Sequence, residues 1–350
     1  MNNLFEQMKT EGHERVLFCS DRASGLQAII AIHNTHLGPA LGGCRMWPYP
    51  DADAALNDVL RLSKAMTYKA AMADLPLGGG KSVIWGDPKK EKSEAKLIAF
   101  AKEVASLGGR YIVAEDVGIG LADIDRMRQV MPHAAGLPEE KGGSGDPSPA
   151  TAYGVFCGMR ASLEERFGES AFQGRKIAIQ GIGKVGYALA LLLHKAGAKL
   201  YVCDMDPERV AAICKVTDAD PLLGHEIYRV ECDVFSPCAL GGFLNERTIP
   251  RLSCEIIAGA ANNQLENAKA AILLKDRNIL YTPDYVLNAG GLINIAEELN
   301  GYSKEKAYQK IEAIYDCVKE VFALAKKASI LPSEAADRLA EARLAAGKRG

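Results

Sequence analysis

Two lysines lie close together in the sequence, and the second follows three consecutive glycines. Lys69 ends the stretch 66–69, and Lys81 comes directly after Gly78-Gly79-Gly80. Glycine lets backbone and ligand approach each other closely, and lysine carries a compact positive charge on a flexible stem. The pattern predicts a cationic, glycine-lined pocket in which Lys81 reaches the reacting molecule. A surface lysine beside a glycine turn is the alternative, because a lysine seen in isolation is usually exposed.

The segment Gly80-Lys81-Ser82 also matches the end of a phosphate-binding P-loop. That motif needs an earlier glycine, at the position held here by Leu75, and a helix after the lysine. The following residues, Val83-Ile84-Trp85, instead have the composition of a strand. A P-loop phosphotransferase is therefore disfavoured.

A second group of glycines, Gly181, Gly183 and Gly186, has the spacing of a dinucleotide-binding turn. Residues 176–180 before it have the pattern of a buried strand, and a helix is predicted after it to about residue 196. Gly181 would make the tight turn, Gly183 would let the pyrophosphate approach the backbone, and Gly186 would let helix and strand pack. The helix N-terminus would supply N–H donors for the phosphates.

An acidic residue follows these glycines at the distance that a dinucleotide-binding fold requires. The next predicted strand, 199–203, is followed by Asp204, which would accept a hydrogen bond from a ribose hydroxyl and repel a 2′-phosphate. The predicted cofactor is therefore NAD rather than NADP. Lys184 and Val185 lie inside the loop and are further cofactor-binding candidates. Lys184 could add phosphate affinity or could be a solvated surface lysine.

Composition and charge narrow the class of protein. The chain has 350 residues, of which 48% are hydrophobic, and 42 basic against 44 acidic residues leave a net charge of -2. This length suits two domains, and the balanced charge provides no broad surface for nucleic acid or an anionic membrane. Nine scattered cysteines without a Cys-x-x-Cys, and six histidines without ligand spacing, predict no disulfide framework and no metal site. With neither a leader pattern nor a long apolar stretch, a cytoplasmic location without a membrane partner is expected.

The first third of the chain alternates between strand and helix patterns, which predicts an α/β domain. The expected strands are residues 16–19, 26–32, 82–85 and 110–114, and the expected helices are 51–66, 94–105 and 123–130. Lys69 should then lie at or just past the end of a helix. Ligands gather at the carboxyl ends of strands in an open α/β sheet, so Asp116 should face the lysines.

A turn-rich connection at residues 141–149 divides the chain. We expect residues 1–140 to form an α/β domain for catalysis, substrate binding and oligomerisation. Residues 141–330 should form a Rossmann-type NAD-binding domain, with the active site in the cleft between the two. A long helix at 303–328 and a final helix from Pro332 are predicted, and the tail 331–350 should pack back on the first domain.

Seven stretches, in order along the chain, resemble those of one enzyme family. They are 37–43 (LGPALGG), 66–69 (MTYK), 78–81 (GGGK), 114–118 (AEDVG), 237–241 (PCALG), 258–265 (AGAANNQL) and 288–291 (NAGG). Together they resemble the glutamate/leucine/phenylalanine/valine dehydrogenases, in particular the leucine dehydrogenase branch. This resemblance covers nearly the whole chain. It implies NAD-dependent, reversible oxidative deamination of an L-amino acid to its 2-oxo acid and ammonium.

The resemblance also implies catalytic roles. Lys69 would hold the substrate carboxylate with help from the backbone near Gly42 and Gly43. Lys81 would activate the water that attacks the imino carbon, and Asp116 would move protons to and from the amine. To activate water, Lys81 must spend time unprotonated. Burial and the charge of Lys69 favour that state, whereas the charge of Asp116 opposes it.

Further residues are implied near the cofactor. Asn262 would contact the substrate and the nicotinamide ribose, while Thr151 and the Cys238-Ala239 backbone would lie near the nicotinamide ring. Each has a structural alternative: Asn262-Asn263 as turn residues, Thr151 as a helix cap and Cys238 as a small packing residue. A nucleophilic role for Cys238 is disfavoured because no histidine motif is present to activate it.

The family's substrate pocket corresponds to Leu41, Ala114, Leu292 and Ile295, which are all apolar. Such a pocket would leave the side-chain carboxylate of glutamate unpaired, so leucine, valine or isoleucine is expected as substrate. The alternatives are an aromatic amino acid, phenylalanine or tryptophan, or a non-catalytic NAD-binding module. The resemblance also implies a homo-oligomer, either a dimer or an octamer. Cys44 stands where threonine is frequent in the family, with no predictable effect.

Overall fold

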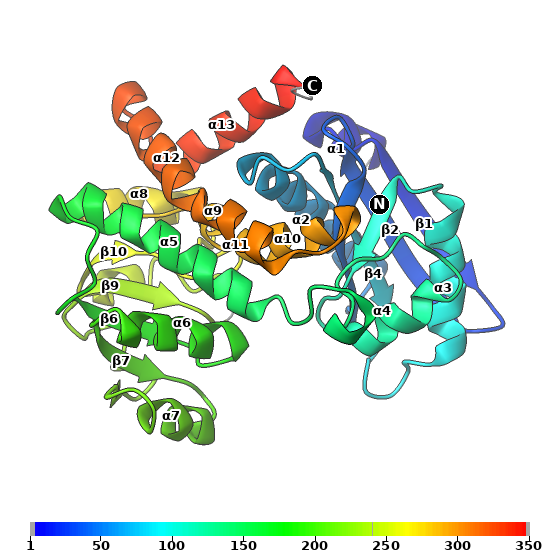
Figure 1. The fold of residues 1–350 in the computed structure, drawn as a ribbon. Helices are drawn as coiled ribbons and strands as arrows, with labels where there is room; N and C mark the ends of the chain where they lie inside the picture. The colour runs from blue at the N-terminus through cyan, green and yellow to red at the C-terminus, as the bar shows by residue number, and fades with distance from the viewer. Residues whose placement is uncertain (1–3, 240, 348–350) are drawn as a thin grey trace. The chain divides into compact units, whose positions relative to one another are not determined.

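The computed structural model describes residues 4–239 and 241–347, and these form two compact units (Figure 1). Unit 1 contains the described residues up to Asp146, together with Ile295–Ser303 and the described residues from Ala340. Unit 2 contains Pro147–Asn294 and Lys304–Leu339.

Unit 1 is built on a five-stranded mixed sheet with the order β1-β2-β4-β3-β5. Its strands are β1 (Arg15–Asp21), β2 (Leu26–Asn34), β3 (Ala40–Trp47), β4 (Gly78–Trp85) and β5 (Tyr111–Ala114), preceded by the short helix α1 (Leu4–Glu11). The β1-β2 and β2-β4 pairs are antiparallel, whereas β3 lies parallel to both β4 and β5. The sequence did not predict β3, because its two glycines weaken the strand pattern.

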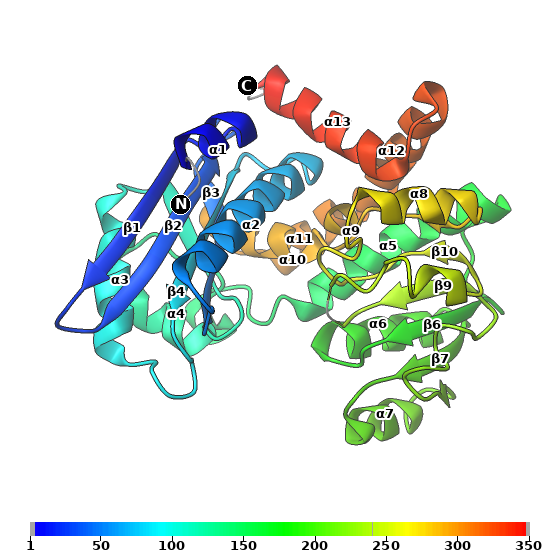
Figure 2. The same cartoon turned by 180° about the vertical axis from the view of Figure 1, so that it is seen from behind.

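Helices cover both faces of this sheet, as Figures 1 and 2 show. The helix α2 (Ala52–Met72) lies on one face, and α3 (Glu94–Ser106) and α4 (Leu121–Arg128) lie on the other. In β2, Ile29 packs in the cluster on the α2 side, whereas Ile30 packs in the cluster on the opposite side. This double burial explains why residues 28–32 form a continuous apolar run rather than an alternating one.

The helix α2 is longer than predicted, and its far end is held by the C-terminal helix α13 (Pro332–Ala346). The Asp51 carboxylate caps its start by accepting from the Ala54 N–H at 2.7 Å. At its end, the Arg343 guanidinium donates to the Ala71 and Met72 carbonyls at 3.2 and 2.8 Å. A cation there satisfies carbonyls that have no partner within the helix. Lys69 therefore lies in the last turn of a supported helix.

Unit 2 is built on a six-stranded parallel sheet with the order β11-β10-β9-β6-β7-β8. Its strands are β6 (Lys176–Gln180), β7 (Lys199–Cys203), β8 (Asp220–Pro221), β9 (Cys232–Pro237), β10 (Cys254–Ile257) and β11 (Leu280–Tyr281). The strand order reverses between β6 and β9, as in a dinucleotide-binding Rossmann sheet. Ligands of such sheets bind at this switch point, beyond the carboxyl ends of the strands.

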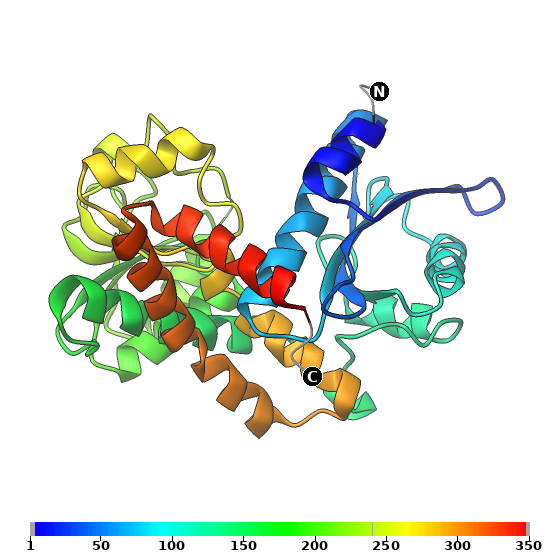
Figure 3. The ribbon, with the colours of Figure 1, turned by 90° about the horizontal axis from the view of Figure 1, so that it is seen from above.

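In unit 2, α5 (Ser148–Phe167) and α6 (Lys184–Lys195) lie on one face of the sheet and α8 (Ala268–Asp276) on the other (Figures 1 and 2). The remaining helices of the chain are α7 (Pro207–Cys214), α9 (Asp284–Leu287), α10 (Gly290–Ala296), α11 (Lys304–Glu312) and α12 (Ile314–Ala328), with short 3₁₀ turns at Glu139–Lys141, Ile249–Arg251 and Glu297–Asn300. The single helix expected at 303–328 is thus two helices, interrupted at Ala313. A bend at Ser329, whose φ is 56°, separates α12 from α13 (Figure 3).

The unit boundaries differ from those expected at residues 140 and 330. The first falls after Asp146, and Ile295–Ser303 belongs to unit 1. The Glu298 carboxylate explains this second difference, because it accepts from the N–H groups of Gly136, Leu137 and Ser144 at 2.8, 3.3 and 2.6 Å. Of the tail expected at 331–350, only the part from Ala340 belongs to unit 1, where Glu341 accepts from the Tyr68 hydroxyl at 2.9 Å.

Two further structural findings concern the whole described chain. Within residues 4–239 and 241–347, no helix is both long and apolar enough to cross a membrane. None of the nine cysteines, all of which lie in the described residues, forms a disulfide.

Two buried histidines pack edge to face in unit 1. The ring centroids of His13 and His33 are 4.8 Å apart. The His33 ring lies 2.8 Å from the Thr67 hydroxyl of α2 and 2.9 Å from the Glu11 carbonyl. Burial is the main cause that lowers the pKa of His33 to about 4, and the charges of His13 and Lys64 act in the same direction. The neutral ring is the form that this site accommodates.

Acid should therefore destabilise unit 1. Since the pKa of His33 is about 4 when folded and about 6.5 when unfolded, the unfolded chain binds the extra proton as pH falls from 6.5 toward 4. The free energy of unfolding should drop by about 2 kcal/mol between pH 7 and pH 5 from this residue alone. Urea denaturation at the two pH values measures the drop. The control His33→Gln should lose about 2 kcal/mol less, and equal losses in both proteins would contradict the assignment.

Candidate active site

Lys81 and Asp116 form a buried ion pair in unit 1. Lys81 lies in β4 and is only 7% exposed, and its Nζ contacts Oδ2 of Asp116, just beyond β5. The alternative of a surface lysine is therefore wrong. A lysine is seldom buried to this degree unless a charge of opposite sign accompanies it.

Gly43 leaves the room in which this pair forms. It lies in β3, the strand between β4 and β5, directly beside Ala114 in the strand register. A Cβ placed on Gly43 would lie 2.7 Å from the Glu115 carbonyl oxygen, 2.8 Å from Asp116 Cβ and 3.2 Å from Lys81 Nζ. A side chain here would occupy the space in which the charges meet. Its neighbour Gly42 is equally constrained, because a Cβ there would lie 1.7 Å from the Gly80 oxygen.

A second cation, Arg45, faces Asp116. Its Nε lies 3.6 Å from Asp116 Oδ2, and its Nη1 lies 2.9 Å from Asp58 Oδ2, which also accepts from the Tyr49 hydroxyl at 2.7 Å. Burial raises the pKa of Asp116, but the charges of Lys81 and Arg45 outweigh this effect and hold that pKa below its ordinary value. Asp116 is therefore a carboxylate at neutral pH.

Sequence reasoning missed Arg45 because it missed β3. Side chains alternate along a strand, so Leu41, Gly43 and Arg45 share one face of β3. Once residues 40–47 are recognised as a strand, this period places Arg45 on the side that carries Asp116. Cys44, between them, points to the opposite face and is fully buried in the core there. The departure from threonine at this position therefore lies in the core rather than beside the ion pair.

The three glycines before Lys81 have a different purpose from the one predicted. They belong to β4 rather than to a turn, and their lack of side chains accommodates the protein itself. A Cβ on Gly79 would lie 2.0 Å from the Thr67 nitrogen of α2, and one on Gly80 would lie 2.8 Å from the Tyr111 ring. These glycines let a helix and a buried tyrosine pack directly against β4.

The same tyrosine supports the strand that carries Gly42 and Gly43. Tyr111 is fully buried, and its hydroxyl donates to the Gly42 carbonyl at 2.8 Å and lies 3.0 Å from the Ser82 hydroxyl. It was not among the predicted site residues. Its hydrogen bonds connect β5, β3 and β4 from the face opposite Lys81.

The other predicted substrate residues are divided between the units. Lys69 is half-buried in the last turn of α2, two residues past Thr67. Leu41 and Ala114 are buried in unit 1 and share the face of the sheet that carries Gly43. Leu292, in unit 2, and Ile295, in unit 1, are buried in α10.

In unit 2, each glycine of the dinucleotide turn has different surroundings. Gly181 has a φ of 97°, which favours glycine. A Cβ on Gly186 would lie 2.0 Å from the Gly181 carbonyl oxygen, so helix α6 packs against the turn itself. A Cβ on Gly183 would meet nothing within 4 Å, so the surface above Gly183 is open to an approaching molecule.

The first turn of α6 and Asp204 lie beside this loop. Gly183 is the N-cap, without a side-chain cap, and Lys184 and Val185 are the first residues of the helix. Asp204 follows β7 and accepts from the Ile182 N–H at 2.6 Å and, through its other oxygen, from the Asp206 N–H at 2.9 Å. The acid therefore holds the glycine loop and lies at the edge of the open surface. The residues present fit the adenosine and pyrophosphate groups of a dinucleotide.

The neighbouring strands bring further predicted residues to the same end of the sheet. A Cβ on Gly181 would lie 2.9 Å from the Ala239 nitrogen and from the Cys238 carbonyl carbon, which follow β9. Burial raises the pKa of the Cys238 thiol, as suits a packing residue. Asn262 lies in the loop after β10 and is exposed. Gln264 in this loop is fully buried.

The helix-cap alternative for Thr151 is wrong. Pro147 is the N-cap of α5, and the Thr151 hydroxyl donates back to the Pro147 carbonyl at 2.9 Å. A Cβ on Gly291 would lie 2.4 Å from this hydroxyl. The turn alternative is correct for Asn263, whose φ is 52°.

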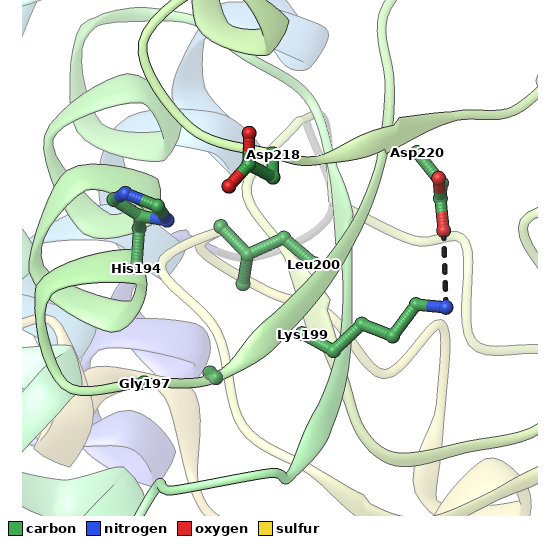
Figure 4. A pocket seen from close by; sticks show the side chains of 7 residues that line it. His194, Gly197, Lys199, Leu200, Asp218 and Asp220 are labelled. Atoms are coloured by element: carbon green, nitrogen blue, oxygen red, sulfur yellow. Dashed lines mark ion pairs between the residues drawn. The ribbon is translucent and has the colours of Figure 1, made fainter.

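A separate hollow of about 430 Å³ lies at the other end of the unit 2 sheet (Figure 4). It is lined by His194 of α6, Leu200 of β7 and Asp218 just before β8. In the same lining, Lys199 pairs with Asp220 at 3.3 Å. Lys199 starts β7, whereas Asp204 follows its end. The hollow therefore lies away from the carboxyl ends of the strands, where the predicted cofactor residues gather.

Known families provide an independent comparison. The model of the Glu/Leu/Phe/Val dehydrogenase dimerisation domain matches residues 13–133, and that of the glutamate/leucine/phenylalanine/valine dehydrogenases matches residues 142–207 and 201–349. The chain belongs to this family. It is an amino-acid dehydrogenase, as the sequence predicted.

Individual relatives match over nearly their whole length. The chain is 52% identical to the leucine dehydrogenase of Geobacillus stearothermophilus, over 97% of this chain and 93% of the relative. It is 47% identical to the phenylalanine dehydrogenase of Thermoactinomyces intermedius, over 98% and 94%. The crystal structure of L-tryptophan dehydrogenase from Nostoc punctiforme superposes with a TM-score of 0.87 at 44% identity, covering 99% of this chain and 100% of that one. The predicted α/β fold is confirmed.

Replacing Gly43 by alanine should disable the dehydrogenase without unfolding unit 2. The added methyl group would press on Asp116 and the Glu115 carbonyl, so turnover should fall by at least about 100-fold. Steady-state kinetics measures the loss, and ADP binding checks unit 2. The matched control is Gly120→Ala, because a Cβ at Gly120 meets nothing within 4 Å. Similar activity in the two variants would show that the space above Gly43 is not needed.

Proposed function

We propose that this dehydrogenase catalyses the NAD-dependent, reversible oxidative deamination of an aliphatic L-amino acid, giving the 2-oxo acid and ammonium. The observation that carries the proposal is the Lys81–Asp116 pair above Gly43, in a chain that belongs to the amino-acid dehydrogenase family. The pair supplies a proton donor and a proton acceptor side by side, as both halves of the reaction require.

The proposed chemistry assigns one task to each charged residue. NAD held at the start of α6 would supply the acceptor for the hydride that leaves the substrate α-carbon. Lys69 pairs with the substrate carboxylate, which fixes the position of that carbon. Asp116 takes a proton from the substrate ammonium group and later returns one to the departing amine. Lys81 takes a proton from the water that attacks the imino carbon, and its direct contact with Asp116 provides a path for protons between them.

Cofactor binding is proposed at the carboxyl ends of the strands in unit 2. The N–H groups at the start of α6 would bind the pyrophosphate above Gly183. Asp204 would accept from the adenosine ribose and disfavour the additional phosphate of NADP, whereas Lys184 and Val185 lie at the edge of the same site. Thr151, Cys238 and Ala239 would lie nearer the nicotinamide.

An aliphatic substrate is favoured because the proposed pocket residues Leu41, Ala114, Leu292 and Ile295 are apolar and buried. Burying the second carboxylate of glutamate among them would be costly. Relatives of similar identity are named for leucine, phenylalanine and tryptophan, so an aromatic amino acid is the second candidate. A homo-oligomer, a dimer or an octamer, is also proposed, since the model matching residues 13–133 is described as a dimerisation domain.

A panel of L-amino acids with NAD tests the proposal. Formation of NADH should be fastest with leucine, valine or isoleucine, slower with phenylalanine or tryptophan, and negligible with glutamate. NADP in place of NAD should reduce kcat/KM, because Asp204 would oppose its extra phosphate. Lys81→Ala serves as the background control, binding NADH without turnover. No NADH formation across the whole panel would refute the proposal.

Removing the second cation should change the pH dependence of the reaction. Without the Arg45 charge, the effect of burial on Asp116 is opposed only by Lys81 and by the hydrogen bond from the Val117 N–H, so the pKa of Asp116 should rise. Asp116 accepts a proton only when ionised, so the acid limb of kcat/KM should move to higher pH in Arg45→Met. The control Arg61→Met removes a charge that also pairs with Asp58, but from an exposed side chain. A limb that moves equally in both variants, or in neither, would contradict the role of Arg45.

A further inference from the structure

The side chain of Asn288 links two parts of unit 2 at the carboxyl end of β10. Asn288 is 5% exposed and starts the segment Asn288-Ala289-Gly290-Gly291, whose resemblance to the family carried no residue role. Its Nδ2 donates to the Ala260 carbonyl at 3.0 Å and to Asn262 Oδ1 at 2.7 Å. Asn262 is the residue proposed to contact the substrate and the nicotinamide ribose.

The Ala260 carbonyl decides which way both amides face. A carbonyl oxygen only accepts, so the group of Asn288 that faces it must be the NH₂. The second N–H of that NH₂ faces Asn262, which must therefore turn its oxygen inward. As a result, Asn262 presents its own NH₂ on the side away from Asn288. The backbone thus sets the orientation of an exposed amide through a buried one.

The surroundings make Asn288 a firm base for this bond. A Cβ on Gly290 would lie 2.2 Å from the Ala150 carbonyl oxygen, so residues 288–291 pack directly against α5. The loop after β10 is held in other ways as well: Gln264 donates to the Gly259 and Ala261 carbonyls, each at 3.0 Å. Loss of Asn288 therefore removes its bonds to Ala260 and Asn262, but the Gln264 bonds that hold the path of the loop stay in place.

We propose that Asn288 is a positioning residue that fixes the Asn262 amide with its N–H end toward the ligand. Asn262 then acts as a hydrogen-bond donor to an acceptor oxygen, either of the substrate carboxylate or of a ribose hydroxyl of the cofactor. Without Asn288, the Asn262 amide loses the hydrogen bond that turns its oxygen inward. The inference rests on the proposed function for the identity of the ligand, but not for the orientation of the two amides.

The test compares four proteins: the wild type, Asn288→Ala, Asn262→Ala and the double variant. Asn288→Ala should weaken NADH binding or raise the KM for the amino acid by about 10-fold or more, as expected when one donor is misoriented. A change in the NADH Kd assigns the acceptor to the cofactor, and a change confined to KM assigns it to the substrate. ADP lacks both the substrate carboxylate and the nicotinamide ribose that Asn262 is proposed to contact, so its Kd should stay within about two-fold of the wild type. The double variant should be no worse than Asn262→Ala.

Two controls separate positioning from general damage. Ser162→Ala removes a different buried polar group of unit 2, a hydroxyl that donates to the Gly158 carbonyl at 2.9 Å, and should lower the melting temperature without changing KM or the NADH Kd. Asn262→Asp keeps an oxygen for Asn288 but replaces the outward NH₂ by a second oxygen. It should bind ligand as poorly as Asn262→Ala while melting at the wild-type temperature or above.

The outcomes are distinct. Full additivity of the Asn288→Ala and Asn262→Ala effects on ligand binding, or wild-type binding by Asn262→Asp, would overturn the inference. Loss of ADP affinity in Asn288→Ala would also overturn it, since that result indicates general damage to the sheet. If the wild type converts no amino acid, the proposed function fails instead. The melting temperatures of the four proteins then still decide whether the two amides are coupled, and additive shifts would refute the inference.

Discussion

The cost of burying the charge of Lys81 governs the architecture of unit 1. Removing one partner of a buried ion pair costs about 3–5 kcal/mol, so Lys81 and Asp116 must meet for the sheet to be stable. They come from β4 and from the end of β5, and β3 lies between these strands. The two charges meet above β3, so this strand must have no side chain at the position that lies beneath them. The parallel register of β3 places Gly43 at this position. On the opposite face of the sheet, the Tyr111 hydroxyl donates a hydrogen bond to the Gly42 carbonyl of the same strand.

In unit 1 the strands bring two charges together. In unit 2 the strands instead end around open space that a ligand can enter. The reversal of strand order between β6 and β9 separates the loops that follow them, and the glycine turn keeps the surface above Gly183 open. Charge plays a smaller part here than hydrogen-bond direction. Asp204 accepts from the Ile182 N–H of the glycine loop, and Asn288 donates to the Asn262 side-chain oxygen.

Much of this organisation could be read from local patterns. The strands around the dinucleotide turn, and the pairing of Lys81 with an acid beyond β5, followed from hydrophobic periodicity and from the rule that sites lie at strand ends. The strand β3 could not be predicted because its two glycines weaken the strand pattern. Without that strand, the position of Arg45 beside Asp116 could not be predicted either. Glu298 and Asn288 could not have been found in this way, because their partners lie far away in sequence. Their hydrogen bonds to backbone groups leave no residue pattern at those partners.

The Glu298 contacts have a consequence for the order in which the chain folds. Unit 1 is not a continuous segment, since Gly136, Leu137 and Ser144 receive their carboxylate from a residue that follows almost all of unit 2 in the sequence. During synthesis on a ribosome, these N–H groups emerge long before their acceptor exists. The N-terminal segment alone is therefore an incomplete folding unit. Its hydrogen bonds to Glu298 can form only after the strands of unit 2 have been synthesised.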